Sequence, residues 1–150
     1  MWGAAMRAVD TNLLVRLATR DDPGQVAVAE AFVAGGAWVS QIVLVEFVWV
    51  LASVYGFEAA RLVTAVEILL NHQQLTVEAS DVVEAALRQY RKDSAAGFSD
   101  CLVLEVARKA GHLPLGTFDR ALGRLPGAKR LEARVGRTRL GSRASNDGPD

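Results

Sequence analysis

Short apolar runs alternate with longer amphipathic stretches along most of this chain. The short runs predict strands over Met6–Asp10, Ala37–Ser40, Leu75–Val77 and Leu113–Leu115, with Ala128–Leu131 as a candidate fifth strand. Apolar residues at helical spacing predict helices over Thr11–Ala18, Val26–Val33, Ile42–Tyr55, Glu58–Leu70, Val82–Arg91 and Ser99–Ala110. Because helices separate the strands, we expect an α/β fold whose sheet is mainly parallel and covered by helices on both faces.

Capping residues mark several helix ends. Ser40 is placed to cap the helix that begins near Ile42, and Gly56 to end it. Ser80 or Asp81 is expected to cap the following Val82–Arg91 helix. Gly111 ends the last helix before the fourth strand.

Four carboxylates stand at the ends or on the faces of these predicted core elements. Glu46 interrupts Ala37–Tyr55, one of the most apolar stretches of the chain, and a buried carboxylate is costly unless it is neutralised, paired or bound to a metal. Asp10 ends the first strand, Asp100 begins a helix, and Asp119 follows the fourth strand. Since ligands of α/β folds bind beyond the carboxyl ends of the strands, we expect the four acids to converge.

A cluster of carboxylates repels itself and needs a cation to remain ionised. All-oxygen sites suit Mg²⁺ or Mn²⁺, and two such ions about 3.5–4 Å apart can clamp a phosphodiester for hydrolysis. Each acid alone also has a structural explanation. Asp10 and Asp100 could cap helices or occupy first turns, and Asp119 could shape a turn, whereas Glu46 is the hardest to explain without a site.

Composition and charge indicate the number of domains, the cellular compartment and a separate tail. The chain has 150 residues, which favours one domain. Its only cysteine, Cys101, is typical of a protein from a reducing, cytoplasmic compartment. We expect Cys101 to be a small core residue. Residues 1–123 carry 10 Lys/Arg against 14 Asp/Glu, a balance of −4, and residues 124–150 carry 7 against 3, a balance of +4. We therefore expect a domain over residues 1–132 and a disordered basic tail over residues 133–150, which could either touch phosphates or be merely solvated.

Other readings fit less well. Ala37–Tyr55 approaches the length of a membrane span, but Ser40, Gln41, Glu46 and Ser53 interrupt it, so a strand followed by a buried helix is favoured. His72 and His112 lie near helix ends, where surface or capping roles are typical. A haloacid-dehalogenase-type site would need an acid where Asn12 stands, and the lysine of a response-regulator receiver is not evident.

The stretches VDTNLLVRL, the Glu46 helix, GFSDCLVLEVARKAG and PLGTFDRALGRL together resemble a PIN domain, and more narrowly the VapC ribonuclease toxins. The resemblance covers Met6 to about Leu131 and implies a PIN-like three-layer α/β/α sandwich with a central, mainly parallel sheet of four to five strands. Residue by residue, it implies that Asp10, Glu46, Asp100 and Asp119 are the catalytic and metal-binding acids. Thr11, Asn12 and Thr117 would orient them. Many relatives carry another acid where this chain has Gly97.

What the resemblance implies is a Mg²⁺- or Mn²⁺-dependent endoribonuclease that leaves 5′-phosphate and 3′-hydroxyl ends. RNA would be its substrate and a small antitoxin its partner, with the antitoxin helix in an apolar groove beside Val26–Val33 and Ile42–Tyr55. The family's members are commonly homodimers, and no membrane role is implied. Two alternatives remain: a housekeeping PIN-domain RNA-processing nuclease without an antitoxin, and a non-catalytic PIN-like interaction domain.

Overall fold

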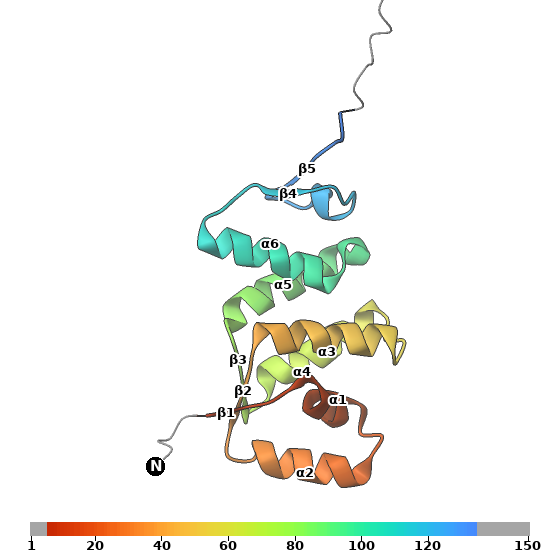
Figure 1. Ribbon diagram of the computed structural model, residues 1–150, viewed down its shortest axis with the longest axis vertical. Helices are drawn as coiled ribbons and strands as arrows, with labels where there is room; N and C mark the ends of the chain where they lie inside the picture. Colours follow the sequence, from red (N-terminus) through yellow and green to blue (C-terminus); the bar gives the residue numbers. More distant parts are fainter. Residues whose placement is uncertain (1–5, 135–150) are drawn as a thin grey trace, which may run out of the picture.

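The computed structural model describes residues 6–134 of the chain (Figure 1). The expected tail over residues 133–150 therefore lies almost entirely outside the described residues. Within residues 6–134, no helix combines the length and the apolar character needed to cross a membrane. The Ala37–Tyr55 stretch folds as a strand followed by a helix, as predicted.

The N-terminal unit is built around three parallel strands. They are β1 (Arg7–Ala8), β2 (Ala37–Val39) and β3 (Leu75–Val77), in the order β1-β2-β3, with Ala8 opposite Trp38 and Trp38 opposite Thr76. The helices of this unit are α1 (Thr11–Thr19), α2 (Pro23–Val33), α3 (Gln41–Ser53) and α4 (Ala59–Asn71). Each pair of neighbouring strands is joined through helices, as parallel pairing requires.

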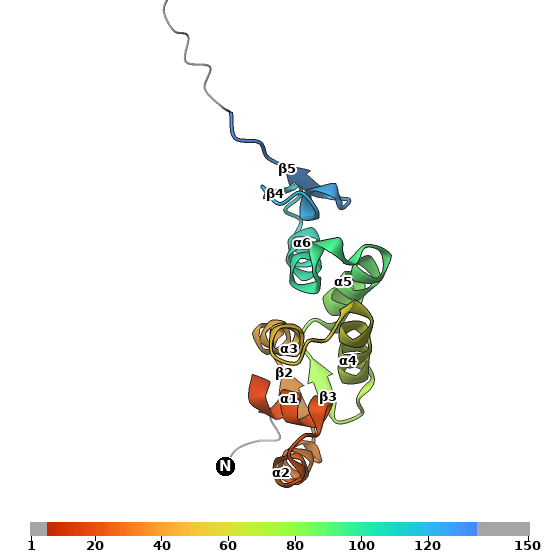
Figure 2. The ribbon, with the colours of Figure 1, turned by 90° about the vertical axis from the view of Figure 1, so that its right-hand side faces the viewer.

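The C-terminal unit contains the remaining elements. They are α5 (Ser80–Lys92), the short 3-10 turn η1 (Ser94–Ala96), α6 (Phe98–Ala110), β4 (Leu115–Thr117), the turn η2 (Leu122–Arg124) and β5 (Ala128–Arg130). β4 and β5 pair in parallel as a second sheet. Both ribbon views place this sheet at the far end of the long axis from β1–β3, with α5 and α6 between (Figures 1 and 2). The four predicted strands and the candidate fifth are all present and parallel, but they form two sheets, of three and two strands, instead of the single central sheet that was expected.

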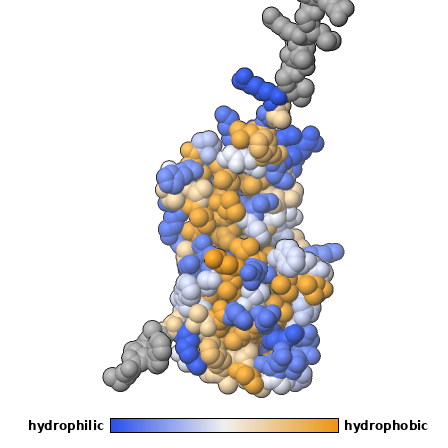
Figure 3. All heavy atoms as spheres, in the orientation of Figure 1, coloured by the Kyte–Doolittle hydropathy of each residue, from blue (hydrophilic) through white to orange (hydrophobic). Residues whose placement is uncertain are grey.

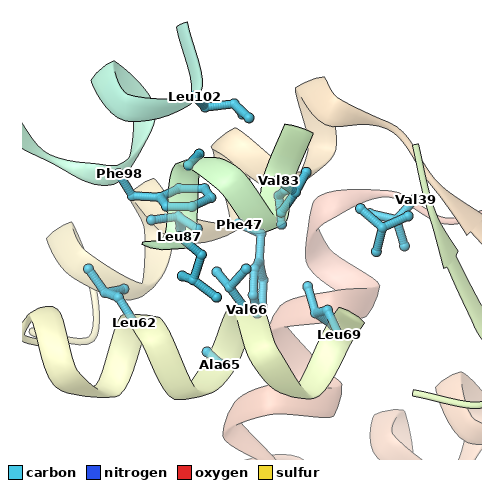
Figure 4. Close-up of a cluster of buried hydrophobic side chains, with 14 of the residues drawn as sticks. Val39, Phe47, Leu62, Ala65, Val66, Leu69, Val83, Leu87, Phe98 and Leu102 are labelled. Atoms are coloured by element: carbon cyan, nitrogen blue, oxygen red, sulfur yellow. The ribbon is translucent and has the colours of Figure 1, made fainter. Parts of the chain in front are cut away.

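One hydrophobic core joins the two units. Phe47 of α3, Val66 of α4, Val83 of α5 and Phe98 of α6 are all at most 3% exposed and belong to one cluster (Figure 4). Burying each such side chain stabilises the fold by about 1.5–3 kcal/mol. The cluster therefore fixes α5 and α6 against α3 and α4.

The two faces of the three-stranded sheet are covered unequally. Ala37 and Val39 point into the core and are fully buried. Trp38, between them, points to the opposite face and is 37% exposed. The expectation of helices over both faces therefore holds only in part around β2.

Several predicted boundaries change for local reasons. Ser40 caps α3 as predicted, since its Oγ accepts a hydrogen bond from the Val43 N–H at 3.1 Å. The predicted cap at Ser80 or Asp81 is wrong, because Ala79 occupies that position with φ 47° and both residues lie inside α5. The fourth strand begins at Leu115 instead of Leu113, because Pro114 has no N–H whereas the Leu115 N–H donates to the Gly127 carbonyl at 2.9 Å. α3 ends at Ser53, two residues before the predicted Tyr55.

Candidate active site

Asp10 and Glu46 lie together in the N-terminal unit. Asp10 follows β1 and caps α1, where its Oδ1 accepts a hydrogen bond from the Leu13 N–H at 3.1 Å. The next residue, Thr11, donates its hydroxyl hydrogen to Glu46 Oε2 at 2.7 Å. The start of α1 is thereby tied to the middle of α3, and the two acids are held beside one threonine.

Glu46 is exposed, and the prediction that it is buried in the core is wrong. α3 is apolar on nearly every side, but only the stripe Leu44, Phe47, Val48 and Leu51 is buried. Glu46 shares the opposite side with Ile42 and Trp49, which are 74% and 64% exposed. An apolar neighbourhood in sequence therefore does not identify the buried face of this helix.

Asp100 and Asp119 form a second pair in the C-terminal unit. Asp100 lies in the first turn of α6, where partial burial and then the charge of Asp119 raise the pKa of its carboxyl group. Asp119 follows β4 and accepts a hydrogen bond on Oδ1 from the Leu122 N–H at 2.8 Å. Its own N–H donates to Thr117 Oγ1 at 3.0 Å. Thr117 therefore fixes the turn that carries Asp119.

The four acids do not form one centre within a single chain in this arrangement. Among the residues that the structure describes, no three Asp, Glu, His or Cys side chains come together as a metal ion would require. Carboxylates are suitable ligands for Mg²⁺ or Mn²⁺, but they occur here as two separate pairs. The residue types fit the metal, and their placement in one copy does not.

The remaining predicted residues divide between the two pairs. Thr11 and Thr117 each make a hydrogen bond to an acid or to its backbone. Asn12 is exposed and lines a groove between α1 and α2. Cys101, next to Asp100, is fully buried. This burial, and to a smaller extent the negative charge of Asp100, raises the pKa of its thiol to about 11. The thiol is therefore protonated near neutral pH, as expected of a core cysteine and not of a nucleophile.

One further acid, which was not among the predicted site residues, lies at the carboxyl end of a strand. Glu78 directly follows β3, and its Oε2 is a buried oxygen without a hydrogen-bond partner in the described structure. Its N–H donates to the Val39 carbonyl at 2.8 Å, which holds it beside β2. The signal was present in the sequence, because LTVE repeats the pattern of AVD: a short apolar strand that ends in an acid.

Two cavities of the described structure lie beside α1. One, of about 470 Å³, lies between α1 and α4 and is lined by Leu17, Phe57 and Leu69 among others. The other, of about 510 Å³, is the groove between α1 and α2, lined by Leu13, Val28 and Phe32 together with Asn12. Neither has any of the four acids in its wall. Cavity size therefore does not locate the chemistry of this protein.

Comparison with known proteins identifies the family of this chain. One solved structure with detectable similarity is VapC20 of Mycobacterium tuberculosis, described as a toxin that cleaves the sarcin–ricin loop. The two sequences are 24% identical, and the match covers 74% of this chain and 86% of that chain with a TM-score of 0.37. No curated protein matches the sequence. The sequence model of the PIN domain matches residues 7–128, a range that contains all four acids. With its parallel strands, intervening helices and this match over most of its length, the chain belongs to the PIN domain family.

Proposed function

We propose that this protein is an endoribonuclease that uses Mg²⁺ or Mn²⁺, and that it is the toxin of a VapC-type toxin–antitoxin pair. The observation that carries the proposal is the pairing of the four acids inside a PIN domain, Asp10 with Glu46 and Asp100 with Asp119. Brought together, these carboxylates would hold the metal, which supplies activation of water and of the scissile phosphate. Residues 1–132 would form the nuclease domain.

The threonine contacts support a site that needs oriented carboxylates. The Thr11 hydroxyl fixes one oxygen of Glu46, and Thr117 fixes the backbone at Asp119. Hydrogen bonds of this kind orient metal ligands in many proteins. A non-catalytic PIN-like domain would have no need for two threonines that hold acids in this way.

The charge around Asp119 supports RNA as the substrate. Residues 115–134 contain five Lys/Arg residues against two Asp/Glu residues. Arg120, Arg124, Lys129 and Arg130 are all exposed there. Such a basic surface next to an acidic pair can bind the phosphates that flank a cleaved bond.

The groove between α1 and α2 supports a helical antitoxin as partner. Leu13, Val28 and Phe32 make its floor apolar, and Arg16 and Asp22 give it charged rims. Val28 is 71% exposed and is therefore available to a partner that enters the groove. An amphipathic helix would bury this side chain and pair with the rims.

The nuclease proposal is tested by incubating the purified protein with RNA in the presence of Mg²⁺, Mn²⁺ or EDTA. We expect cleavage with either metal, none with EDTA, and only a small residual rate from Asp10→Asn. Asn is as good a helix cap as Asp, so this variant keeps the fold while it removes a ligand charge. Cleavage that is equally fast in EDTA, or retained by Asp10→Asn, would contradict the assigned site.

The toxin proposal needs a separate experiment. We expect expression of the chain to arrest growth, and co-expression of a small protein encoded directly upstream to restore it. Sequencing of RNA 5′ ends from arrested cells would identify the target. Cleavage without growth arrest, and without rescue by a neighbour, would instead favour a housekeeping RNA-processing nuclease.

A further inference from the structure

The site proposed above is incomplete in one copy of the chain. Asp10 and Glu46 lie in the N-terminal unit, and Asp100 and Asp119 in the C-terminal unit. The inference below rests on the proposed function, because it assumes that the two pairs act together.

Both pairs lie next to a strand with an open edge. The Val9 N–H donates to the Trp38 carbonyl at 3.1 Å, so the backbone groups of Ala8, one residue earlier, point away from β2. The Leu115 N–H and the Thr117 carbonyl bond to the chain at β5, so the backbone groups of Gly116 point away from β5. β1 and β4 are thus both edge strands with unpaired N–H and C=O groups, which readily pair with another strand. Asp10 and Asp119 lie two residues beyond Ala8 and Thr117 respectively.

The C-terminal unit cannot reach β1 of its own chain while its packing remains intact. Phe47 and Phe98, in the core shared by α3 and α6, are 0% and 3% exposed. Leu122 and Leu125, beside β4 and β5, are 6% and 4% exposed within the same core. Arg108 of α6 also donates a hydrogen bond to the Pro126 carbonyl. Moving β4 to its own β1 would break these contacts, whereas a second copy can approach with them in place.

We propose that two copies of this chain pair reciprocally, with β4 of each copy aligned along β1 of the other. Each pairing would extend the three-stranded sheet to five strands and bring Asp100 and Asp119 of one copy to Asp10 and Glu46 of its partner. The contact is self-complementary, because every copy carries one acceptor edge and one donor strand. The dimer therefore contains two composite sites.

Exposed apolar side chains support the same arrangement. Phe118, between Thr117 and Asp119, is 71% exposed. On α6, Val103 and Val106 are 50% and 42% exposed, and on α3 Trp49 is 64% exposed. Hydrophobic side chains gather on the face that carries α3 and α6 (Figures 1 and 3). Several exposed apolar side chains on one face are typical of an interface, and a second copy lying along this face would cover them.

Inter-subunit complementation tests the proposal. Asp10→Asn and Asp100→Asn chains with different affinity tags are co-expressed, and heterodimers are isolated by tandem purification. In a reciprocal dimer, one site carries both substitutions and the other carries neither. We expect each variant alone to keep only a small residual activity and the heterodimer to recover about half of the parental activity per dimer. If each chain builds its own site, both sites are damaged and no activity returns.

A matched control places both substitutions in the same unit. The heterodimer of Asp10→Asn with Glu46→Gln carries one damaged acid in each composite site, so no recovery is expected. Recovery in this control would reveal exchange or contamination. An active parent whose Asp10→Asn/Asp100→Asn heterodimer stays inactive would overturn the reciprocal dimer and leave the proposed nuclease intact. An inactive parent would instead sink the proposed function.

The mass of the protein decides the pairing independently of activity. Ala8→Pro removes the outward N–H of β1 and leaves the Val9 bond to Trp38 in place, whereas Ala8→Val keeps the N–H. By light scattering we expect a dimer for the parent and Ala8→Val, and a folded monomer for Ala8→Pro. Gly116→Pro on β4 is the second variant if Ala8→Pro fails to fold. A monomeric parent would overturn the proposal. A proline variant that remains dimeric would overturn it too, because another surface, such as the antitoxin groove, would then hold the two copies together.

Discussion

The two acid pairs of this protein are held in different ways. Asp10 and Glu46 are exposed and hold favourable hydrogen bonds, one as a helix cap and one from the Thr11 hydroxyl. Asp100 is partly buried next to Asp119, and both effects raise the pKa of its carboxyl group. The first pair is compatible with an ordinary structural role, whereas the second is held against electrostatic repulsion.

This difference bears on function. A helix cap stabilises its helix whether or not a metal binds, so the position of Asp10 alone says little about chemistry. Asp100 is kept beside another acid and has no basic partner among the causes of its pKa shift, so ionisation of its carboxyl group costs stability. Departures of this kind concentrate at functional sites. The C-terminal pair is therefore the stronger sign of a site, and the N-terminal pair supplies its geometry.

The largest expected effect tests whether the two units share one core. Phe47→Ala removes a fully buried side chain of α3 from the core that both units share, and should lower the free energy of unfolding by about 3–5 kcal/mol. Urea unfolding can be followed by tryptophan fluorescence, which comes from Trp38 and Trp49 of the N-terminal unit and from Trp2 ahead of it in the sequence, and by far-UV circular dichroism, which reports all helices. We expect the two curves to coincide. Separate transitions would show that the units unfold independently.

The next effect isolates the Thr11–Glu46 contact. Thr11→Val removes the hydroxyl that donates to Glu46 Oε2 while it keeps the shape of the side chain. Cleavage should fall by about 10–100-fold, mostly through weaker metal binding, as for other groups that orient metal ligands. A Mg²⁺ titration of the cleavage rate measures it. Thr64→Val, which changes an exposed hydroxyl on α4 bonded to the Ala60 carbonyl, is the control and should leave cleavage unchanged.

The smallest expected effect compares Asp100, whose pKa is raised, with Asp21, whose pKa is lowered. Hydrogen bonds from Thr19, then Arg16 and Tyr55, lower the pKa of Asp21. In EDTA at pH 7, Asp100→Asn should therefore raise the melting temperature slightly, and Asp21→Asn should lower it slightly. The Asp21 contribution is present above its unfolded pKa of about 3.9 and is lost as the pH falls through its lower folded pKa. Thermal melts above and below these two pKa values check the direction of the pH dependence. Melting temperatures that change in the same direction for the two variants at pH 7 would contradict this account.

Local patterns predicted most of the fold. The strands at Ala37 and Leu75 and the caps at Ser40 and Gly111 appear where the sequence placed them. These features depend on a few neighbouring residues, such as a hydroxyl before a helix or a glycine after it. The order of the four acids was also readable, because it follows from strand and helix ends.

The packing of distant segments against one another could not be predicted from the sequence. The buried side of α3 is chosen by packing against α1, α4 and α6, and an almost uniformly apolar helix carries no periodic signal to announce that choice. Glu46 was therefore assigned to the core and is exposed. In the same way, no local pattern states whether β4 pairs with its own β1 or with another chain. The division of the sheet into three and two strands is a property of the whole molecule.

The central claim is that the two acid pairs form one catalytic centre, and a double-mutant cycle tests it most directly. Asp10→Asn, Asp100→Asn and the double variant are compared with the parent for the rate of RNA cleavage in saturating Mg²⁺. Residues that act as one unit show strong non-additivity, since losing one costs about as much as losing both. We predict the same residual rate for all three variants. A double variant whose loss equals the product of the two single losses would show that the pairs act independently, and would contradict a shared site.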